Sequence, residues 1–309
     1  MPLPEELHEL ARRVSNWGRW GADDERGTLN LIDAAAVQRG VACVRKGVAF
    51  SLAIPFDADG PQLGTIPGRV NPIHTVTAVN VAFTGDPDDF TTSDDRVDLG
   101  VQAATHWDTL AHVGYGGVLY NGVPNSVVTE ADGATRLGVE AIGPVTSRGI
   151  VLDVARALDE DPLPGGHPIT ADDLDAALGL TGITPEPGDV ALVRTGQLAV
   201  LRAGDKKRFS MQSPGLSTKS IEWLHAHQWA AVATDALTFE CYPCEDPAVL
   251  FPVHMIQLRD MGLLQGQLWD LDMLASDCAS DGAYGCLLVA NPVPITHGIG
   301  GIVAPVAVK

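Results

Sequence analysis

One stretch of eleven residues, from Gln102 to His112, constrains the fold of this chain more than any other. It reads Gln-Ala-Ala-Thr-His-Trp-Asp-Thr-Leu-Ala-His, with several metal-binding side-chain types in an otherwise apolar run. Side chains on a strand alternate between two faces, so a strand places Gln102, His106 and Asp108 on the same face. A helix would turn His106 and Asp108 to nearly opposite sides. The spacing therefore predicts a strand that leads into a turn.

An imidazole and a carboxylate on one face of a strand can bind a single ion. Such mixed nitrogen and oxygen ligands suit Zn, Mn or Fe, and the residues alone do not choose between them. The alternative interpretation is structural, with His106 as a buried histidine whose ring is capped by the neighbouring Asp108. The spacing leaves both interpretations open.

The composition argues against several classes of partner. The formal net charge is −19 at pH 7, which repels nucleic acid and anionic membrane surfaces. No apolar stretch is long enough to span a bilayer. The first residues lack the basic and apolar segments of a signal peptide, so we expect a cytoplasmic protein. Five cysteines fit free thiols better than a disulfide framework.

Hydrophobic periodicity predicts alternating helices and strands. We expect helices over residues 5–14, 33–46, 171–178, 217–227 and 254–262, and strands over 48–54, 74–83, 149–154, 190–196, 230–234 and 285–290. The acidic segment 86–98 is rich in turn residues and is interpreted as a solvated loop. Alternating strands and helices are typical of the α/β class, whose ligand sites lie at strand ends. Asp108, Thr195 and Asp235 are expected at such ends.

Two other regions carry residues that could act at a site. Trp17 and Trp20 stand in a loop rich in glycine and acidic residues, either as anchors of that loop or as part of an arm over a ligand pocket. Cys241 and Cys244 form a Cys-x-x-Cys pair that precedes His254. Because a structural zinc site requires four ligands, we interpret the cysteines as free thiols. No dinucleotide fingerprint or P-loop is present, so no nucleotide cofactor is expected.

These segments resemble the "Putative cyclase" family, which includes bacterial kynurenine formamidases and isatin hydrolases. The hallmark of that family, His-x-Gly-Thr-His-x-Asp-x-x-x-His, corresponds to the stretch from Gln102 to His112. The resemblance covers nearly the whole chain from Trp17, and continues in the strands beginning at Gly149 and Gly188, in Asp235, in His254 and in the Leu-Trp-Asp-Leu run after Gln267. The loop from Trp20 to Asn30 is similar to the longer branch of the family.

The resemblance implies a fold and a metal centre. The fold is a swivelling β/β/α domain of the α/β class, a mixed sheet with flanking helices, formed by residues 1–309 with an N-terminal arm at 1–47. Homodimers or homotetramers are implied as well. Transferred residue by residue, the family pattern makes His106 and Asp108 metal ligands. It also places His112 close to the metal-bound water and His254 in the same site.

Two positions depart from the family pattern. Gln102 replaces the first histidine of the motif, and Gln267 replaces a carboxylate of the binuclear formamidases. A glutamine at the second position resembles the mononuclear isatin hydrolases. We therefore expect one divalent ion, held by His106, Asp108, Gln267 and Gln102, with Mn²⁺ favoured over Zn²⁺.

The function implied is a metal-dependent hydrolase. It would open a C–N or ester bond of a small cyclic or aromatic amide or lactone, by attack of metal-activated water. His112 or His254 would transfer the proton. The expected substrate-binding residues are Trp17, Trp20, Trp107 and Asp235. Two alternatives remain: an intramolecular cyclase or lyase that uses the same site, and a metal-poor, non-catalytic relative that binds a ligand.

Overall fold

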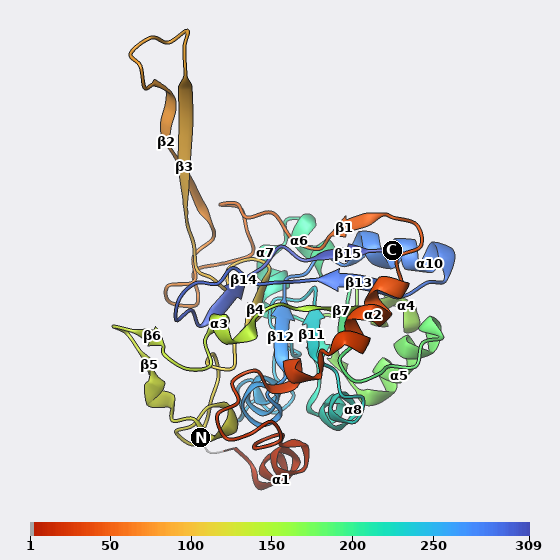
Figure 1. The fold of residues 1–309 in the computed structure, drawn as a ribbon. Coiled ribbons are helices and arrows are strands. Elements are labelled where there is room, and N and C mark those ends of the chain that lie inside the picture. Colours follow the sequence, from red (N-terminus) through yellow and green to blue (C-terminus); the bar gives the residue numbers. More distant parts are fainter. Residues whose placement is uncertain (1–2) are drawn as a thin grey trace.

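The structure of this protein is a computed structural model that describes residues 3–309. Within these residues a mixed sheet of nine strands forms the centre of the molecule. Helices flank the sheet, and a long hairpin projects from this body (Figure 1). The predicted α/β class, a mixed sheet with flanking helices, is confirmed. The predicted single domain of residues 1–309 includes residues 1–2, which lie outside the described residues.

The central sheet combines parallel and antiparallel strands. In order across the sheet they are β1 (Ala49–Ser51), β15 (Val306–Val308), β13 (Gly285–Val289), β7 (Thr146–Asp153), β9 (Val190–Arg194), β11 (Ala231–Thr234), β12 (Leu264–Gln267), β4 (His106–Asp108) and β14 (Gly300–Ile302). The four strands from β7 to β12 in this order run parallel. β4 is antiparallel to both of its neighbours, β12 and β14.

Helices cover the sheet on its two faces. They are α1 (Glu5–Val14), α2 (Ala34–Ala42), α3 (Val139–Ile142), α4 (Val154–Ala157), α5 (Ala171–Thr181), α6 (Leu198–Arg202), α7 (Lys206–Met211), α8 (Ile221–Ala226), α9 (Pro252–His254) and α10 (Asp272–Asp281). Short 3₁₀ turns are η1 (Gly27–Leu31), η2 (Tyr120–Gly122), η3 (Asn125–Val127) and η4 (Thr218–Ser220). Among residues 3–309, no helix is long and apolar enough to cross a membrane.

Smaller strand pairs lie outside the sheet. β8 (Pro168–Ile169) pairs with β10 (Gly215–Leu216), and β5 (Val128–Thr129) pairs with β6 (Gly133–Ala134). The projecting hairpin consists of β2 (Ile73–Ala82) and β3 (Thr91–Asp98).

Local signals fixed the start of two predicted helices. In α5 the Thr170 side chain accepts a hydrogen bond from the Asp173 backbone, and the Asp173 carboxylate accepts one from the Thr170 backbone, which together form a capping box. In α2 a single bond caps the helix, because the Asp33 carboxylate accepts from the backbone N–H of Ala36. α2 ends earlier than predicted, at Ala42, where no buried apolar stripe continues the helix.

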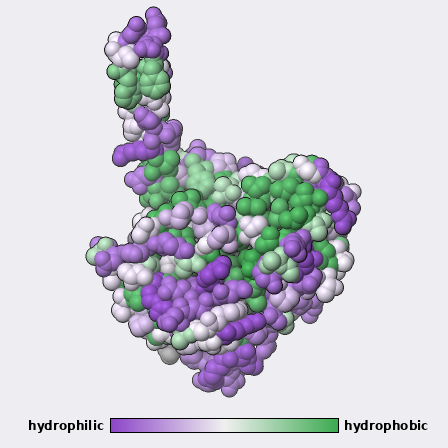
Figure 2. All heavy atoms as spheres, in the orientation of Figure 1, coloured by the Kyte–Doolittle hydropathy of each residue, from purple (hydrophilic) through white to green (hydrophobic). Residues whose placement is uncertain are grey.

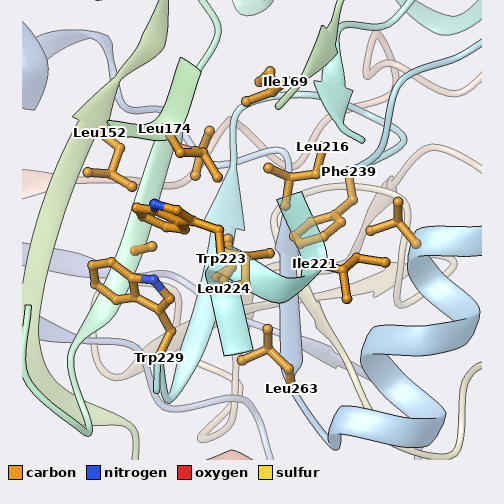
Figure 3. Packing of buried hydrophobic residues seen from close by; sticks show 14 of the residues in the cluster. Leu152, Ile169, Leu174, Leu216, Ile221, Trp223, Leu224, Trp229, Phe239 and Leu263 are labelled. Atoms are coloured by element: carbon orange, nitrogen blue, oxygen red, sulfur yellow. The ribbon is translucent and has the colours of Figure 1, made fainter. Parts of the chain in front are cut away.

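Alternate residues of the central strands pack into two different cores. Leu152 of β7 contributes to a cluster with side chains of α1, α5 and α8, in which Trp223 and Trp229 stack with ring centroids 6.0 Å apart (Figure 3). Its neighbour Val151 contributes to a second cluster, which includes Trp107 and residues of α10. The alternation of a strand therefore explains why both faces of the sheet are buried.

The predicted helix 254–262 differs from expectation in its geometry. It begins at Pro252, and after α9 it continues as a π-helical segment, η5 (Met255–Met261). It ends at Gly262, where φ is +61° and an added Cβ would contact the ring of Tyr120. π-Helical turns are rare and are frequent at functional sites.

The hairpin corrects one prediction from the sequence. Strand β2 was expected over 74–83 and is confirmed, but the predicted loop over 86–98 is wrong in its second half. Residues 91–98 form β3, which pairs with β2 from Thr91 opposite Ala82 to Asp98 opposite Ile73. The strand was missed because its sequence is polar apart from Val97, and backbone pairing with β2 stabilises it instead of burial.

Candidate functional site

The candidate site is built on β4. This strand is hydrogen-bonded on both sides, with Trp107 paired to Gly266 of β12 and to Gly301 of β14. His106 and Asp108 are buried, with 1% and 0% of their surface exposed. Their side chains share one face, as the strand alternation predicts.

Two imidazoles and one amide converge on Asp108. Its Oδ1 atom lies 3.5 Å from Nε2 of His106 and 3.6 Å from Nε2 of His112. Its Oδ2 atom accepts a hydrogen bond from the side-chain amide of Gln267. Nδ1 of His106 lies 2.7 Å from the carbonyl oxygen of Ala104 and must donate to it, so Nε2 carries a free lone pair when the ring is neutral.

Two of these buried atoms lack a hydrogen-bond partner within residues 3–309, namely Nε2 of His106 and Oδ1 of Asp108. A buried polar atom without a partner is costly, so such atoms in a native site call for an explanation. Two ligand atoms bound to one ion at about 2.1 Å lie roughly 3–3.5 Å apart. The 3.5 Å between Nε2 of His106 and Oδ1 of Asp108 therefore fits a metal ion bound by both atoms.

The side chains at this site supply only part of the ligands that a metal ion needs. Across residues 3–309, no group of three or more His, Cys, Asp and Glu side chains is arranged so that it could hold a metal ion, so such an ion would have at most two of these side chains as ligands. An imidazole nitrogen and a carboxylate oxygen from adjacent positions of one face are ligands for Zn²⁺ or Mn²⁺. We conclude that the residues present fit one ion whose remaining ligands are water or substrate.

The charges around Asp108 favour its ionised form. Burial alone would raise the pKa of Asp108, but the imidazoles of His112 and His106 outweigh it and hold that pKa well below its usual range. For His112 the balance is the opposite, because burial lowers its pKa despite the attraction of Asp108. At neutral pH, His112 is therefore neutral and able to accept a proton.

His254 reaches the site from α9 with its ring fixed by Glu240. Nδ1 of His254 lies 2.5 Å from Oε1 of Glu240, whose carboxylate also accepts hydrogen bonds from the backbone N–H groups of Val253 and His254. Nε2 of His254 lies 3.4 Å from the amide nitrogen of Gln267. The sequence reasoning missed Glu240, whose only signal was an acidic residue in the otherwise uncharged run 236–244.

The two glutamines of the predicted ligand set lie in different environments. Gln267 lies between Asp108 and His254, and its N–H group, not its oxygen, faces Asp108. Gln102 precedes β4 in a turn, and its amide nitrogen lies against Gly300. In the described part of the chain Gln102 makes no hydrogen bond to His106 or Asp108. Since the strand begins only at His106, its alternation does not extend to Gln102.

Trp107 lies on the other face of β4, away from His106 and Asp108. Its ring is fully buried and meets Trp269 at a centroid distance of 4.6 Å. Its indole N–H donates to the carbonyl oxygen of Ala290. The predicted place of Trp107 in a substrate-binding wall is therefore corrected, because strand alternation turns it into the core.

Trp17 and Trp20 lie on the surface of the N-terminal segment. The guanidinium of Arg259 stacks over Trp17 at 4.6 Å, and that of Arg19 over Trp20 at 4.7 Å. Trp17 lines a pocket of about 330 Å³ between α1, Tyr115 and Arg259. As described over residues 3–309, the lining of this pocket includes none of the four residues His106, Asp108, His112 and His254.

Asp235 directly follows β11, and its side chain hydrogen-bonds the residues that follow β9. Its carboxylate accepts hydrogen bonds from the backbone and hydroxyl of Thr195, at 2.9 and 2.7 Å, and from the backbone of Gly196 at 2.8 Å. Burial raises the pKa of Asp235 to about 6 although the bonds from Thr195 oppose this. Both of its oxygens hold the turn after β9, so the predicted substrate contact is replaced by a structural role. All five cysteines, including Cys241 and Cys244, are free thiols.

The fold and the site define an α/β protein whose central sheet carries a buried imidazole–carboxylate pair, with two further histidines beside it. The chain belongs to the family described as "Putative cyclase", whose model matches residues 50–241. It is similar to a crystal structure described as a novel cyclase, with 35% identity and a TM-score of 0.87, covering 96% of this chain and 100% of the other. The family predicted from the sequence is thereby confirmed.

More distant structures share the fold. Isatin hydrolase A from Ralstonia solanacearum is 20% identical, with a TM-score of 0.62 over 89% of this chain and 95% of the other. A structure described as a potential metal-dependent hydrolase with cyclase activity is 16% identical, with a TM-score of 0.50 over 84% of this chain and 98% of the other. Among curated protein sequences, none matches this chain.

Proposed function

We propose that this protein is a metal-dependent hydrolase that opens a C–N or ester bond of a small cyclic or aromatic amide or lactone. The observation that carries the proposal is the buried pair of unpartnered atoms in residues 3–309, Nε2 of His106 and Oδ1 of Asp108. The fold shared with a protein named isatin hydrolase A supports hydrolysis as the reaction class.

His106 and Asp108 would hold the ion. When bound, a divalent metal activates a water molecule and polarises the carbonyl group of the substrate. Mn²⁺ is favoured over Zn²⁺ because two side-chain ligands are fewer than zinc sites ordinarily use, whereas carboxylate and water ligands suit Mn²⁺. One ion is favoured over two because Gln267 directs an N–H group at Asp108 where a second ion would require an anionic ligand.

His112 is the proposed proton acceptor. Its side chain is 22% exposed, so a water molecule or a substrate can reach the ring while its Nε2 atom stays near Asp108. Burial lowers its pKa, which keeps the imidazole neutral and ready to take a proton from the attacking water.

His254 is proposed to deliver a proton to the leaving nitrogen or oxygen in its imidazolium form, in which Nε2 carries the transferred proton and Glu240 balances the charge at Nδ1. Glu240 accepts a hydrogen bond from Nδ1, so the ring is fixed with Nε2 directed towards Gln267 and the site. Phe239 and Phe251 contact the ring of His254 with centroids 5.8 and 5.3 Å away. Phe239 is fully buried, but Phe251 is partly exposed and offers apolar surface to a flat substrate. We therefore assign to Phe251 the role that Trp107 cannot fill.

The proposal is tested by a hydrolysis screen with a matched histidine pair. Wild-type protein loaded with Mn²⁺ is assayed on cyclic amides, lactones and N-formyl aromatic amines. For a substrate that is turned over, His112→Ala is expected to lower kcat about 10²–10⁴-fold, the usual contribution of a general base. His74→Ala, at an exposed position of the hairpin, is expected to keep the wild-type rate.

The metal content of both variants is measured in the same preparation. Full activity in His112→Ala with the ion still bound would show that another group accepts the proton. A metal-loaded wild type that turns over none of these classes would contradict the hydrolase proposal and favour the ligand-binding alternative.

A further inference from the structure

Arg69 belongs to a loop that is fixed against the residues preceding β4. This loop, residues 60–72, leads from the body into β2. Two hydrogen bonds close it: the backbone N–H of Gln62 donates to Oδ1 of Asn71 at 2.9 Å, and the side-chain amide of Asn71 donates to the carbonyl oxygen of Gln62 at 3.0 Å. The side-chain amide of Gln62 also donates to the carbonyl oxygen of Ala103 at 2.9 Å. The loop therefore has a defined position beside the strand that carries the site.

Backbone packing connects Arg69 to the site. An added Cβ at Gly100 would lie only 3.1 Å from Cα of Arg69, so the two backbone segments touch. Two residues further along the chain, the amide nitrogen of Gln102 lies against Gly300. Gly300 in turn pairs with Asp108 across β14 and β4. A series of close contacts thus leads from the backbone of Arg69 to the strand position of Asp108.

The charge of Arg69 reaches the polar side chains of the site. Its side chain is partly buried, and burial lowers its pKa although the carboxylate of Asp108 opposes this. After burial itself, the positive charge of Arg69 is among the causes that lower the pKa of His112. The backbone packing and these electrostatic effects agree that the guanidinium lies on the side of Asp108 and His112.

Arg69 differs from other partly buried arginines of this chain because it has no carboxylate partner. The guanidinium of Arg194 forms ion pairs with three aspartates, and that of Arg148 pairs with Asp189 at 2.6 Å. Within residues 3–309, the guanidinium of Arg69 forms neither a hydrogen bond nor an ion pair with a carboxylate. A partly buried charge without a partner is costly. Arg69 is therefore arranged to receive an anion from outside the chain.

Apolar side chains accompany this cation. The same loop carries Leu63, Ile66 and Val70, each at least 42% exposed. Figure 2 shows hydrophobic surface at the base of the hairpin, where this loop leads into β2. Ligand sites commonly combine apolar surface with a few polar groups that fix the orientation of the ligand. A guanidinium beside apolar side chains suits a ligand that has both an anionic group and an apolar body.

We propose that Arg69 binds a carboxylate of the substrate, so that the hydrolase acts on aromatic or cyclic amides or lactones that carry a carboxylate group. This inference rests on the proposed function and adds the substrate class. A guanidinium presents its N–H donors in a planar fork that matches both oxygens of a carboxylate. The chain has a net charge of −19 and repels small anions over most of its surface, so binding an anionic substrate requires a local cation.

The kinetic test compares 2-formamidobenzoate with formanilide, two N-formyl aromatic amides that differ only in the carboxylate. Arg69→Met removes the charge, and Arg69→Gln is a second neutral variant. The matched control is Arg96→Met, at an exposed arginine of β3. In Arg69→Met, KM for 2-formamidobenzoate is expected to rise about 10–100-fold, the loss of a hydrogen bond to a charged group. Its kcat, and both constants for formanilide, are expected to stay within about threefold of wild type, because only substrate binding is affected.

A binding measurement separates this inference from the hydrolase proposal, because it requires no turnover. Mn²⁺-reconstituted protein is titrated calorimetrically with benzoate and with benzamide, and metal content and far-ultraviolet circular dichroism are recorded for each variant. Wild type and Arg96→Met are expected to bind benzoate at least about tenfold more tightly than benzamide. Both Arg69 variants are expected to lose this preference at unchanged metal content, and Arg69→Gln decides if Arg69→Met fails to fold.

The outcomes of the two measurements are distinct. Equal affinity of wild type for benzoate and benzamide, or a preference for benzoate that persists in a folded Arg69 variant, would overturn the inference. A kcat lowered equally for 2-formamidobenzoate and formanilide would also overturn it, because Arg69 would then act on the reacting group that both compounds share. Benzoate binding that depends on Arg69, without hydrolysis of any tested compound, would contradict the hydrolase proposal and leave the carboxylate site in place.

Discussion

At the scale of single residues, the site depends on which nitrogen of each histidine faces inward. The carbonyl of Ala104 takes the Nδ1 proton of His106, and the carboxylate of Glu240 takes that of His254. In both rings Nε2 therefore faces the site, as a lone pair in neutral His106 and as the N–H that donates when His254 is an imidazolium. A backbone carbonyl and a buried carboxylate thus set the orientation on which the proposed metal ligand and the proposed proton donor depend.

Glu240 is the positioning residue whose role is most directly tested by substitution. Its carboxylate accepts three hydrogen bonds, and a glutamine amide can accept them through only one atom. We expect Glu240→Gln to lower kcat about 10–100-fold, the usual effect of losing a supporting hydrogen bond, with little change in KM. Steady-state kinetics on a substrate found in the screen measure kcat and KM separately.

The control for this substitution is Glu245→Gln, a nearby acidic residue that hydrogen-bonds Ser217 and does not contact His254. It is expected to stay within about twofold of wild type, since surface changes away from a site have small effects. An unchanged kcat in Glu240→Gln would mean that His254 needs no carboxylate to act.

The residue pattern predicted part of this site and not the rest. The alternation of a strand accounts for His106 and Asp108 on one face, and His112 follows in the turn that the sequence predicted. Their metal and catalytic roles stay predictions. Glu240 could not be found, because its contact with His254 depends on the conformation of the loop between them. The alternation that puts His106 and Asp108 on one face of β4 also predicts that Trp107 lies on the opposite face, in the core.

At the scale of elements, the site rests on close packing behind β4. An added Cβ at Gly266 of β12 would lie 2.8 Å from atoms of Ala233, Trp107 and Trp269. Only glycine therefore lets β12 approach these side chains on the core side of the sheet while Gln267, next along the strand, reaches Asp108 on the other. The absence of a side chain at Gly266 therefore affects both the packing of the core and the position of Gln267 in the site.

We expect Gly266→Ala to destabilise the fold by about 1–3 kcal/mol, since overpacking a filled core forces shifts in its neighbours. Gly179→Ala is the matched control, because Gly179 lies within α5 with no atom near its added Cβ. The control is expected to be neutral or to stabilise the helix by about 0.5–1 kcal/mol. Urea unfolding measures both, and equal stability of Gly266→Ala and wild type would contradict the packing argument.

Elements with a strong local signal were predictable and others were not. α1 and α5 were indicated by apolar spacing, and the capping box fixed the start of α5. The strand β3 was missed because its stability comes from pairing with β2, which leaves no hydrophobic pattern. The π-helical geometry of η5 was missed because apolar periodicity does not distinguish it from an α-helix over so few residues.

At the scale of the whole molecule, strand order decides where the site lies. β4 lies between β12 and β14, which come from the last third of the chain, and β1 pairs with β15 at the far end of the sheet. Such pairings join residues far apart in sequence, and no local pattern reports them. The family resemblance, by contrast, implied the mixed sheet and its helices before the order of strands was known.

The whole molecule also combines two surfaces of different kinds. The site around Asp108 is buried within the body, whereas the β2–β3 hairpin extends away from it (Figure 1). The loop that leads into β2 contributes Arg69, whose pKa is lowered by burial although the carboxylate of Asp108 opposes this, so the loop lies near the site.

The most direct test of the central claim is the number of metal ions per chain, determined by elemental analysis of purified protein after reconstitution. Wild type and His74→Ala are expected to bind about one Mn²⁺ or Zn²⁺ per chain, and Asp108→Asn to bind at least tenfold more weakly. A value near two would show that Gln102 and Gln267 leave room for a second ion. No bound metal in reconstituted wild type, or an unchanged content in Asp108→Asn, would contradict a metal-dependent hydrolase centred on His106 and Asp108.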